Sequence, residues 1–268
     1  MTLVIISGGI DLSVGSIVAL STVVVAWLLQ YAGVGPLTAA LGGVAAAALF
    51  GLISGTLITR LKVVPFIVTL GMMLVVRGAA KGIAREQKID VDPGRLQWLQ
   101  ELLASVPQDK SWMLVPAGVW ILVLLAVGTA FLLRYIRVGR HIFAIGSNEH
   151  TARLCGVGVE RVKVFVYTAC GAFAGLAGVM QFSRLTVGDP TVAAGLELDV
   201  IAAVVIGGGS LSGGEGSVLG TLMGALIMTV IASGCTQMGL PNWVQQIITG
   251  CIIVVAVALD RLRHRKKS

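Results

Sequence analysis

A succession of apolar runs constrains this chain more than any other feature. A membrane-spanning α-helix needs about 20 consecutive, mostly apolar residues. Seven runs approach or exceed that length: 14–32, 37–59, 63–82, 113–133, 163–183, 217–234 and 244–259. Two shorter apolar pieces, 2–6 and 198–206, lead directly into glycine-rich breaks. These runs predict an all-α, polytopic transmembrane bundle of about eight to nine apolar segments, broken or short helices included.

Composition places the chain outside the soluble classes. Hydrophobic residues make up 56% of the 268 residues and charged residues 12%. The hydrophobic fraction is higher, and the charged fraction lower, than in soluble globular domains. The formal net charge of +7 comes from basic residues at the ends of apolar runs and in the C-terminal tail, and no basic patch interleaved with aromatic residues occurs. We therefore expect a single transmembrane permease domain over 1–268, surrounded by lipid, with no nucleic-acid partner.

The basic segment 134–163 orients the other runs. It holds six Lys or Arg residues and two acidic residues. Because basic residues beside spans stay on the cytoplasmic side, this loop and the basic C-terminus are predicted to be cytoplasmic. The segment 83–112 has more acidic than basic residues and is predicted to lie in the periplasm. Arg77 and Lys81, at an outer end of a span, depart from the rule.

Two polar segments carry predicted surface helices. Within the basic loop, 148–155 has the small, charged and polar residues of a short helix that a soluble partner could grip. In the periplasmic segment, apolar residues at helical spacing predict a helix on the outer membrane surface. These residues are Leu96, Leu99, Leu102, Leu103 and Val106. That helix is either a lid packed on the bundle or part of a docking surface for an external protein.

Two glycine-rich stretches resemble each other: VIISGGIDLSVGSIV at 4–18 and VIGGGSLSGGEGSVL at 205–219. Broken helices at corresponding places in two halves indicate a transport pathway, because unwound backbone at membrane depth must be buried or line a cavity. The candidate pathway residues are Asp11, Ser13, Gly15, Gly208 and Gly209. The alternative is a pair of tight turns at the membrane surface, with Asp11 capping the helix that begins near Ser13.

Small residues recur every four positions within several runs. They are Ala47, Gly51 and Gly55; Gly171 and Gly175; and Gly216, Gly220 and Gly224. Lipid gives no hydrophobic drive for helix association, so close backbone approach through small residues supplies the contact instead. The pattern predicts a tightly packed bundle.

The sequence carries no recognised catalytic or metal-binding motif. A phosphate loop of the form GxxxxGK[ST], a GxSxG elbow and an HExxH pair are all absent. The four cysteines have neither disulfide nor zinc-ligand spacing, and the three histidines are dispersed. We predict a transport subunit without catalytic residues, metal or cofactor.

Three motifs together resemble the permease subunits of bacterial ABC importers for ribose, galactose, xylose and related sugars. They are GGIDLSVGS at 8–16, GSNEHTARLCGVGVERVK at 146–163 and ELDVIAAVVIGGGSLSGGEGSVLGTLMGAL at 197–226. The resemblance implies a permease homodimer or heterodimer in the inner membrane, ATP-binding subunits at the cytoplasmic loops and a periplasmic sugar-binding protein. ATP hydrolysis is then expected on the separate partner subunit. Family members also carry a further span before the first motif, and this sequence starts after it.

The resemblance also implies that the short helix in the basic loop couples ATP hydrolysis to transport. The residues expected at that contact are Asn148, Glu149, Ala152, Arg153 and Gly156. Two other functions remain open: a branched-chain amino-acid ABC permease, which shares the architecture, and an ion-coupled secondary transporter. Secondary transporters usually place several ionisable residues inside their spans, and this chain has few besides Asp11.

Overall fold

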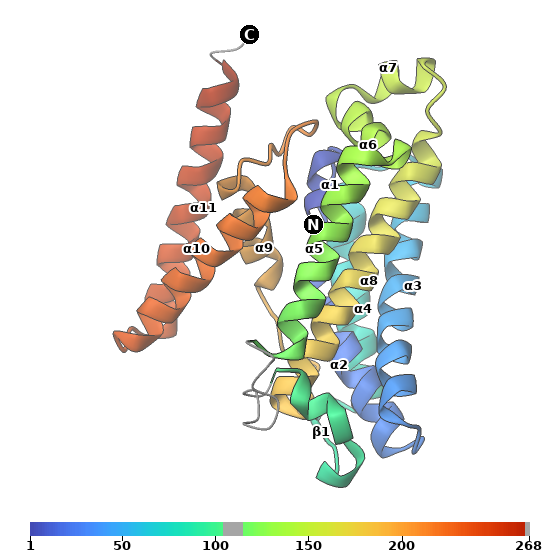
Figure 1. Cartoon of the computed structure of the whole chain (residues 1–268), viewed down its shortest axis with the longest axis vertical. Helices are drawn as coiled ribbons and strands as arrows, with labels where there is room; N and C mark the ends of the chain where they lie inside the picture. Colours follow the sequence, from blue (N-terminus) through green and yellow to red (C-terminus); the bar gives the residue numbers. More distant parts are fainter. Residues whose placement is uncertain (104–114, 266–268) are drawn as a thin grey trace. The chain divides into compact units, whose positions relative to one another are not determined.

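A computed structural model describes residues 1–103 and 115–265, and nearly all of its secondary structure is helical (Figure 1). The α-helices are α1 (Thr2–Ile6), α2 (Val14–Gln30), α3 (Pro36–Leu61), α4 (Pro65–Ile83), α5 (Ala117–Tyr135), α6 (Arg137–Ser147), α7 (Glu149–Leu154), α8 (Val159–Leu185), α9 (Leu196–Ile206), α10 (Val218–Gln237) and α11 (Asn242–Arg265). Two 3₁₀-helices, η1 (Pro93–Arg95) and η2 (Gln97–Leu102), lie between α4 and α5. The strands β1 (Ile89–Asp90) and β2 (Val187–Gly188) pair antiparallel. The predicted all-α class is confirmed.

Five of the described helices are long and apolar enough to cross a membrane: α3, α4, α5, α8 and α10. The apolar α2 is shorter, with 17 residues, and the apolar part of α11 covers Asn242–Ala258. The chain is therefore a multi-pass membrane protein. The predicted run 113–133 begins outside the described residues, and its helix begins at Ala117.

Prolines and a serine determine where three of these helices begin. Pro36 and Pro65 stand at the start of α3 and α4, where the missing N–H is harmless because first-turn amides have no intrahelical acceptor. Lys62 ends α3 in the left-handed conformation, with φ of 52°. Ser217 caps α10, and its hydroxyl accepts the Gly220 N–H at 3.0 Å. Local chemistry thus fixes the helix ends that separate the apolar runs.

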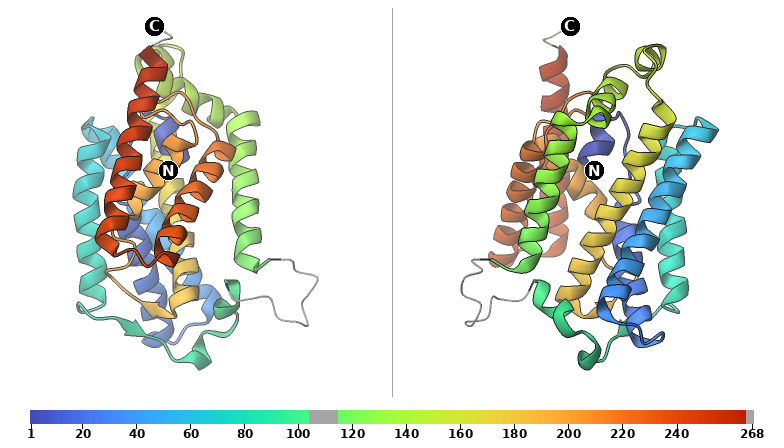
Figure 2. Two further views of the ribbon diagram at one scale, coloured as in Figure 1. Left: turned by 90° about the vertical axis from the view of Figure 1, so that its left-hand side faces the viewer. Right: turned by 45° about the vertical axis from the view of Figure 1, so that its right-hand side comes forward.

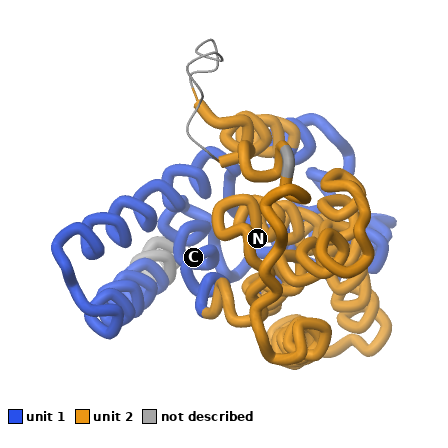
Figure 3. Tube along the Cα trace, turned by 90° about the horizontal axis from the view of Figure 1, so that it is seen from below, with its two compact units in different colours: residues 1–10, 129–162, 195–268 blue, residues 11–128, 163–194 orange. Residues whose placement is uncertain are grey.

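The contacts divide the chain into two compact units, which are coloured separately in Figure 3. Unit 1 comprises residues 1–10, 129–162 and 195–268, and unit 2 comprises residues 11–128 and 163–194. Each unit therefore combines segments that are far apart in the sequence. A single permease domain over 1–268 stays a prediction.

The central helix of unit 2 is α2, of whose 17 residues 13 are buried. It packs against α3, α4 and β2. A Cβ atom on Gly178 of α8 would lie 2.5 Å from the Ser21 Cβ, and one on Gly43 of α3 would lie 2.9 Å from the Ser21 hydroxyl. That hydroxyl donates a hydrogen bond to the Gly175 carbonyl at 2.8 Å. Because Gly43 and Gly178 have no side chain, the backbones of α3 and α8 can both approach α2 closely.

The helices α3 and α8 of unit 2 touch through their backbones. A Cβ on Gly51 would overlap the Tyr167 carbonyl oxygen. On the other side of the contact, a Cβ on Gly171 would lie 2.6 Å from the Ala47 carbonyl oxygen, and one on Gly175 would lie 2.6 Å from the Ala47 Cβ. The small residues predicted to promote packing on these two helices therefore face each other.

In unit 1, α9 packs against α10 and α11, and a short turn joins the latter two helices (Figures 1 and 2). A Cβ on Gly224 would overlap the Ala203 carbonyl, and one on Gly220 would overlap the Gly207 carbonyl. Two members of the predicted α10 glycine row thus form the contact with α9. The third, Gly216, lies before α10 with φ of 153° and belongs to the preceding loop.

The structure differs from the surface helix that the sequence predicts within 83–112. Its described part is a 3₁₀-helix, η2, and Leu96, Leu99 and Leu102 are buried in unit 2 at 1%, 0% and 8% exposure. The Arg95 guanidinium holds the segment down by donating to the Leu29 carbonyl at 2.8 Å. Three of the four described leucines face the protein, and Leu103 is 38% exposed. The described part therefore packs on the bundle, as a lid would, rather than lying on lipid. Val106 lies outside the described residues.

The backbone contact between α3 and α8 predicts the effect of one added methyl group. Gly51→Ala should lower the free energy of unfolding by about 1–3 kcal/mol, because its Cβ forces two packed backbones apart. Gly78→Ala on α4 is the matched control, since a Cβ added there would have no atom within 4 Å. Thermal unfolding of the detergent-purified variants measures both. Equal melting temperatures would contradict the glycine contact.

Candidate functional site

The predicted short helix in the basic loop is present as α7, in unit 1. Asn148 is its N-cap, and the Asn148 Oδ1 accepts the Thr151 N–H at 2.9 Å. Gly156, with φ of 82°, follows the C-cap Cys155 and lets the chain leave the helix. The six-residue helix is therefore defined at both ends by its own sequence.

Arg153 ties α7 to the beginning of α8. Its guanidinium lies 3.5 Å from the Glu149 carboxylate on the same helix and also donates a hydrogen bond to the Glu160 carboxylate. The hydrogen bond from Arg153 to Glu160 raises the pKa of the guanidinium, which thus stays charged. All three side chains remain about half exposed, at 46–49%. Glu160 was missed as a site residue because it lies on the next helix, across the turn that follows α7, so the spacing within α7 does not reveal the pair.

The five predicted coupling residues lie together, but they do not share one surface. Glu149 and Arg153 are exposed, as are Asn148 and Gly156. Ala152 is 4% exposed and faces the interior of the unit. A partner that docks on α7 would therefore meet the backbone of the helix at Ala152 and not its side chain.

Both predicted glycine breaks interrupt helices, and they meet in unit 1 at a contact that we call the glycine junction: Ile6, Gly8, Gly146, Gly213 and Gly214. The Gly214 N–H donates to the Ile6 carbonyl at 2.9 Å. A Cβ on Gly146 would overlap that same carbonyl and lie 2.5 Å from the Gly214 nitrogen. A Cβ on Gly213 would lie 2.9 Å from the Gly8 Cα. Gly146 belongs to the last turn of α6, so the junction lies directly before α7.

Asp11, Ser13 and Gly15 belong to unit 2 and are fully buried there. The Asp11 Oδ1 accepts both the Ser13 N–H, at 2.9 Å, and the Ser13 hydroxyl, at 2.6 Å. Ser13 is the N-cap residue of α2, so the carboxylate stabilises the start of that helix, as the capping alternative predicts. Tyr167 of α8 lies close enough to interact electrostatically with Asp11, and its hydroxyl is buried without a hydrogen-bond partner among the described residues.

Gly208 and Gly209 terminate α9 in unit 1. The Gly208 N–H donates to Val205 and the Gly209 N–H to Val204, both at 2.9 Å, and Gly208 has φ of 86°. This is the hydrogen-bond pattern of a glycine-dependent helix end. The five predicted pathway residues are thus divided between the units, and their role in a pathway stays a prediction.

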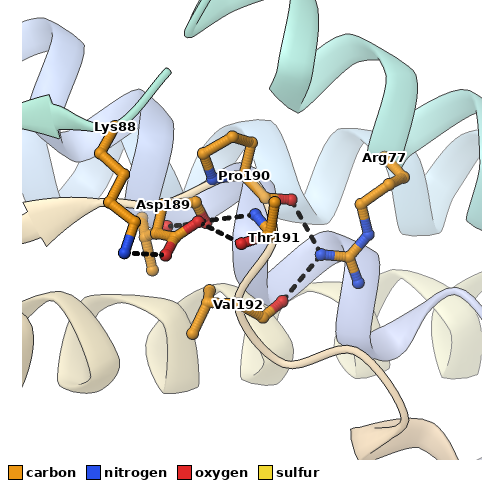
Figure 4. A network of polar contacts seen from close by, with 7 residues as sticks. Arg77, Lys88, Asp189, Pro190, Thr191 and Val192 are labelled. Carbon is orange, nitrogen blue, oxygen red and sulfur yellow. Dashed lines mark hydrogen bonds and ion pairs between the residues drawn. The ribbon is translucent and has the colours of Figure 1, made fainter. Parts of the chain in front are cut away.

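A polar network that the sequence did not reveal lies at the end of α8 in unit 2 (Figure 4). Arg77 of α4 donates from Nη1 to the Pro190 carbonyl at 3.0 Å and to the Val192 carbonyl at 2.7 Å. The Asp189 carboxylate lies 3.1 Å from the Lys88 ammonium and accepts two hydrogen bonds from Thr191. The arginine that departed from the charge rule therefore anchors the segment that leads from α8 to α9.

Opposing effects set the pKa of Asp189. Burial alone would raise it, but the hydrogen bonds from Thr191 and the nearby Lys88 ammonium outweigh burial and hold the pKa below its usual range. The ionised carboxylate is thus the form that the folded chain favours.

Comparison with known proteins gives the chain a family context. Residues 1–257 match the family described as "Branched-chain amino acid transport system / permease component". The chain is 37% identical over 268 residues to the ribose import permease protein RbsC of Escherichia coli, covering 98% of this chain and 81% of the relative. It is 40% identical over 262 residues to RbsC of Bacillus subtilis, covering 97% and 79%. The fructose import permease protein FrcC of Rhizobium meliloti is 37% identical over 266 residues, covering 97% and 72%. No solved structure matches the chain.

The network around Asp189 predicts a pH dependence of stability. Because its folded pKa is lowered, the carboxylate contributes stability above its unfolded pKa of about 3.9. That contribution is lost as the pH falls through the lower folded value. At pH 7, Asp189→Asn should lower the free energy of unfolding by about 1–3 kcal/mol and so lower the melting temperature. This loss of stability should become smaller below pH ~4. Thermal unfolding in detergent measures it, with the exposed Asp90→Asn as control; a difference that grows on acidification would refute the assignment.

The glycine junction predicts that Gly146 tolerates no side chain. Gly146→Ala should destabilise the folded protein by about 1–3 kcal/mol or more, because the added carbon overlaps main-chain atoms that cannot rotate away. Gly158→Ala in the same loop is the control, since its nearest atom would be 3.9 Å away. Thermal unfolding and the yield of monodisperse protein compare the two. The junction is not a close contact if Gly146→Ala behaves like the control.

Proposed function

Because the chain belongs to the family of branched-chain amino acid transport system permease components, we propose that it forms the membrane pathway of an ATP-driven importer for a monosaccharide. The relatives named for ribose and fructose import support a sugar over an amino acid as the substrate. Their identity of 37–40% extends over nearly the whole chain. The substrate class therefore rests on the full sequence and not on one motif.

The observation that carries the coupling part of the proposal is the preformed helix α7. It is capped by Asn148 and presents Glu149 and Arg153 at its surface. Arg153 also contacts Glu160 of α8, so a force on α7 reaches a helix long enough to span the membrane. We propose that an ATP-binding subunit docks on this helix from the cytoplasm.

Docking alone does not drive transport. ATP must favour one access state of the permease over the other, because a ligand with equal affinity for both states shifts nothing. The glycine junction supports a route for that bias, since Gly146 of α6 contacts both glycine breaks within unit 1. Movement of α6 and α7 would then change the contact between Ile6 and Gly214.

The remaining partners follow from the importer proposal. A periplasmic sugar-binding protein would deliver the substrate, and a second permease copy would complete the pathway. The basic loop and the C-terminus would face the cytoplasm, in the inner membrane, and the segment 83–112 would face the periplasm. The burial of Leu99 and Leu102 in η2 supports a lid role for the described part of this segment.

An ion-coupled carrier is the alternative from a different class. The apolar windows of the five candidate spans contain at most two charged residues each, and carriers of that class use ionisable groups inside their spans. Asp11 is buried, but its Oδ1 is engaged with Ser13 at the start of α2. The described spans thus offer few groups for ion coupling.

Substrate class and energy source are tested together by reconstitution. The chain, its co-expressed ATP-binding subunit and the binding protein are placed in proteoliposomes, and uptake of labelled ribose, fructose and leucine is compared with and without internal ATP. ATP-dependent uptake of a sugar supports the proposal. ATP-dependent uptake of leucine instead would show that the chain imports an amino acid. Uptake driven by an ion gradient without ATP would rule out ABC transport.

The α7 contact predicts which substitutions separate the permease from its ATP-binding subunit. Glu149→Gln combined with Arg153→Gln should reduce co-purification at least ten-fold, because it removes both exposed charges of α7. Arg161→Gln, an exposed arginine at the start of α8, is the control and should retain the subunit. Mass analysis of the detergent-purified complexes gives the ratio, and unchanged melting of the isolated permease shows that the variants fold. Full retention in the double variant would remove these two residues from the docking surface.

A further inference from the structure

Three exposed arginines lie three positions apart in the sequence, where α5 ends and α6 begins in unit 1. Arg134 lies in the last turn of α5, and Arg137 and Arg140 lie in the first turns of α6. All three side chains are exposed. We call them the arginine row.

The arginine row lacks acidic neighbours. Residues 129–148 contain no Asp or Glu, and among the side chains that the structure describes no ion pair involves any member of the row. The next acidic residues along the chain, Glu149 and Glu160, are both engaged with Arg153. Within the described part of the chain, three exposed positive charges therefore have no ion-pair partner.

The fold fixes the direction of the row. The opposite face of α6 is buried through Gly139, Ile142 and Ile145, so Arg137 and Arg140 cannot turn inward without exposing that face. Positive charge in the first turn of a helix opposes the helix dipole. The two arginines consequently do not serve the stability of α6, and an external anion would offset their unfavourable position.

Aromatic residues beside the row have the character of a membrane boundary. Phe131 and Tyr135 are 54% and 60% exposed, and their ring centroids lie 5.1 Å apart. The Arg134 guanidinium lies 5.5 Å from the centroid of the Tyr135 ring. Exposed aromatic rings at the end of an apolar spanning helix are typical of the headgroup level of a bilayer, and arginine extends from that level toward phosphate.

We propose that the arginine row binds the phosphate groups of anionic phospholipids. The guanidinium fork matches phosphate geometry with paired hydrogen bonds, and a basic cluster beside a spanning helix attracts acidic lipid at close range. The exposed rings of Phe131 and Tyr135 would contact the acyl chains of the same lipid. This inference does not depend on the transported substrate or on the ATP-binding subunit.

The test uses the full chain, purified in neutral detergent without partners. Native mass spectrometry compares retention of phosphatidylglycerol with that of phosphatidylcholine of the same acyl chains. The wild type should retain phosphatidylglycerol selectively, and Arg137→Gln combined with Arg140→Gln should weaken its binding roughly ten- to thirty-fold. Arg153→Gln combined with Arg161→Gln is the control, because it removes the same charge from the same loop and should leave phosphatidylglycerol retention within about two-fold of the wild type.

Three outcomes would overturn the proposal. Equal retention of the two lipids by the wild type would show that charge plays no part. An equal loss in the control would show general attraction to a basic loop and no site. Unchanged phosphatidylglycerol binding in the Arg137 and Arg140 double variant would show that the row does not hold the lipid. Loss of the ATP-binding subunit from that variant, in a separate co-purification, would then identify the row as a protein interface. Matching melting temperatures in lipid-free detergent confirm that the variants are folded.

Discussion

Close approach of helix backbones through glycine is the constraint on which this structure depends. Lipid surrounds the spanning helices, so burying apolar side chains between them gains little, and contact distance decides the packing. In unit 2 the same arrangement encloses α2 and joins α3 to α8, and in unit 1 it joins α9 to α10. Between α3 and α8 and between α9 and α10, a main-chain carbonyl stands where a side chain would otherwise be, and around α2 the side chain of Ser21 does. None of these contacts leaves room for one more methyl group.

The same chemistry has a different consequence at the glycine junction. There the ends of two helices, Ile6 of α1 and Gly146 of α6, meet the unwound glycines of the breaks. The hydrogen bond between Ile6 and Gly214 joins pieces of chain more than 200 residues apart. Gly146 brings the segment before α7 into that contact. Arg153 connects the other end of α7 to α8 through Glu160. The proposed docking helix is therefore attached to unwound backbone on one side and to a long helix on the other.

Local patterns predicted most of the fold, and long-range pairing explains what they missed. Hydropathy indicated the spanning helices, and the small, charged and polar residues of 148–155 indicated the short helix that the structure shows as α7. The segment that holds η2 buries Leu99 and Leu102 within unit 2, and Arg95 donates to the carbonyl of Leu29, which lies 66 residues earlier. Glu160 likewise pairs across a turn. Such contacts leave no periodic signal, so the helix was predictable at the candidate site whereas its attachment to α8 was not.

The hydrogen bonds of Arg77 can form only late in the synthesis of the chain. Its carbonyl acceptors lie 113 and 115 residues later, so at roughly 5–20 residues per second they emerge from the ribosome about 6–23 s after the arginine does. The two hydrogen bonds that join α4 to this segment therefore form only after α8 and the loop that follows it have been made.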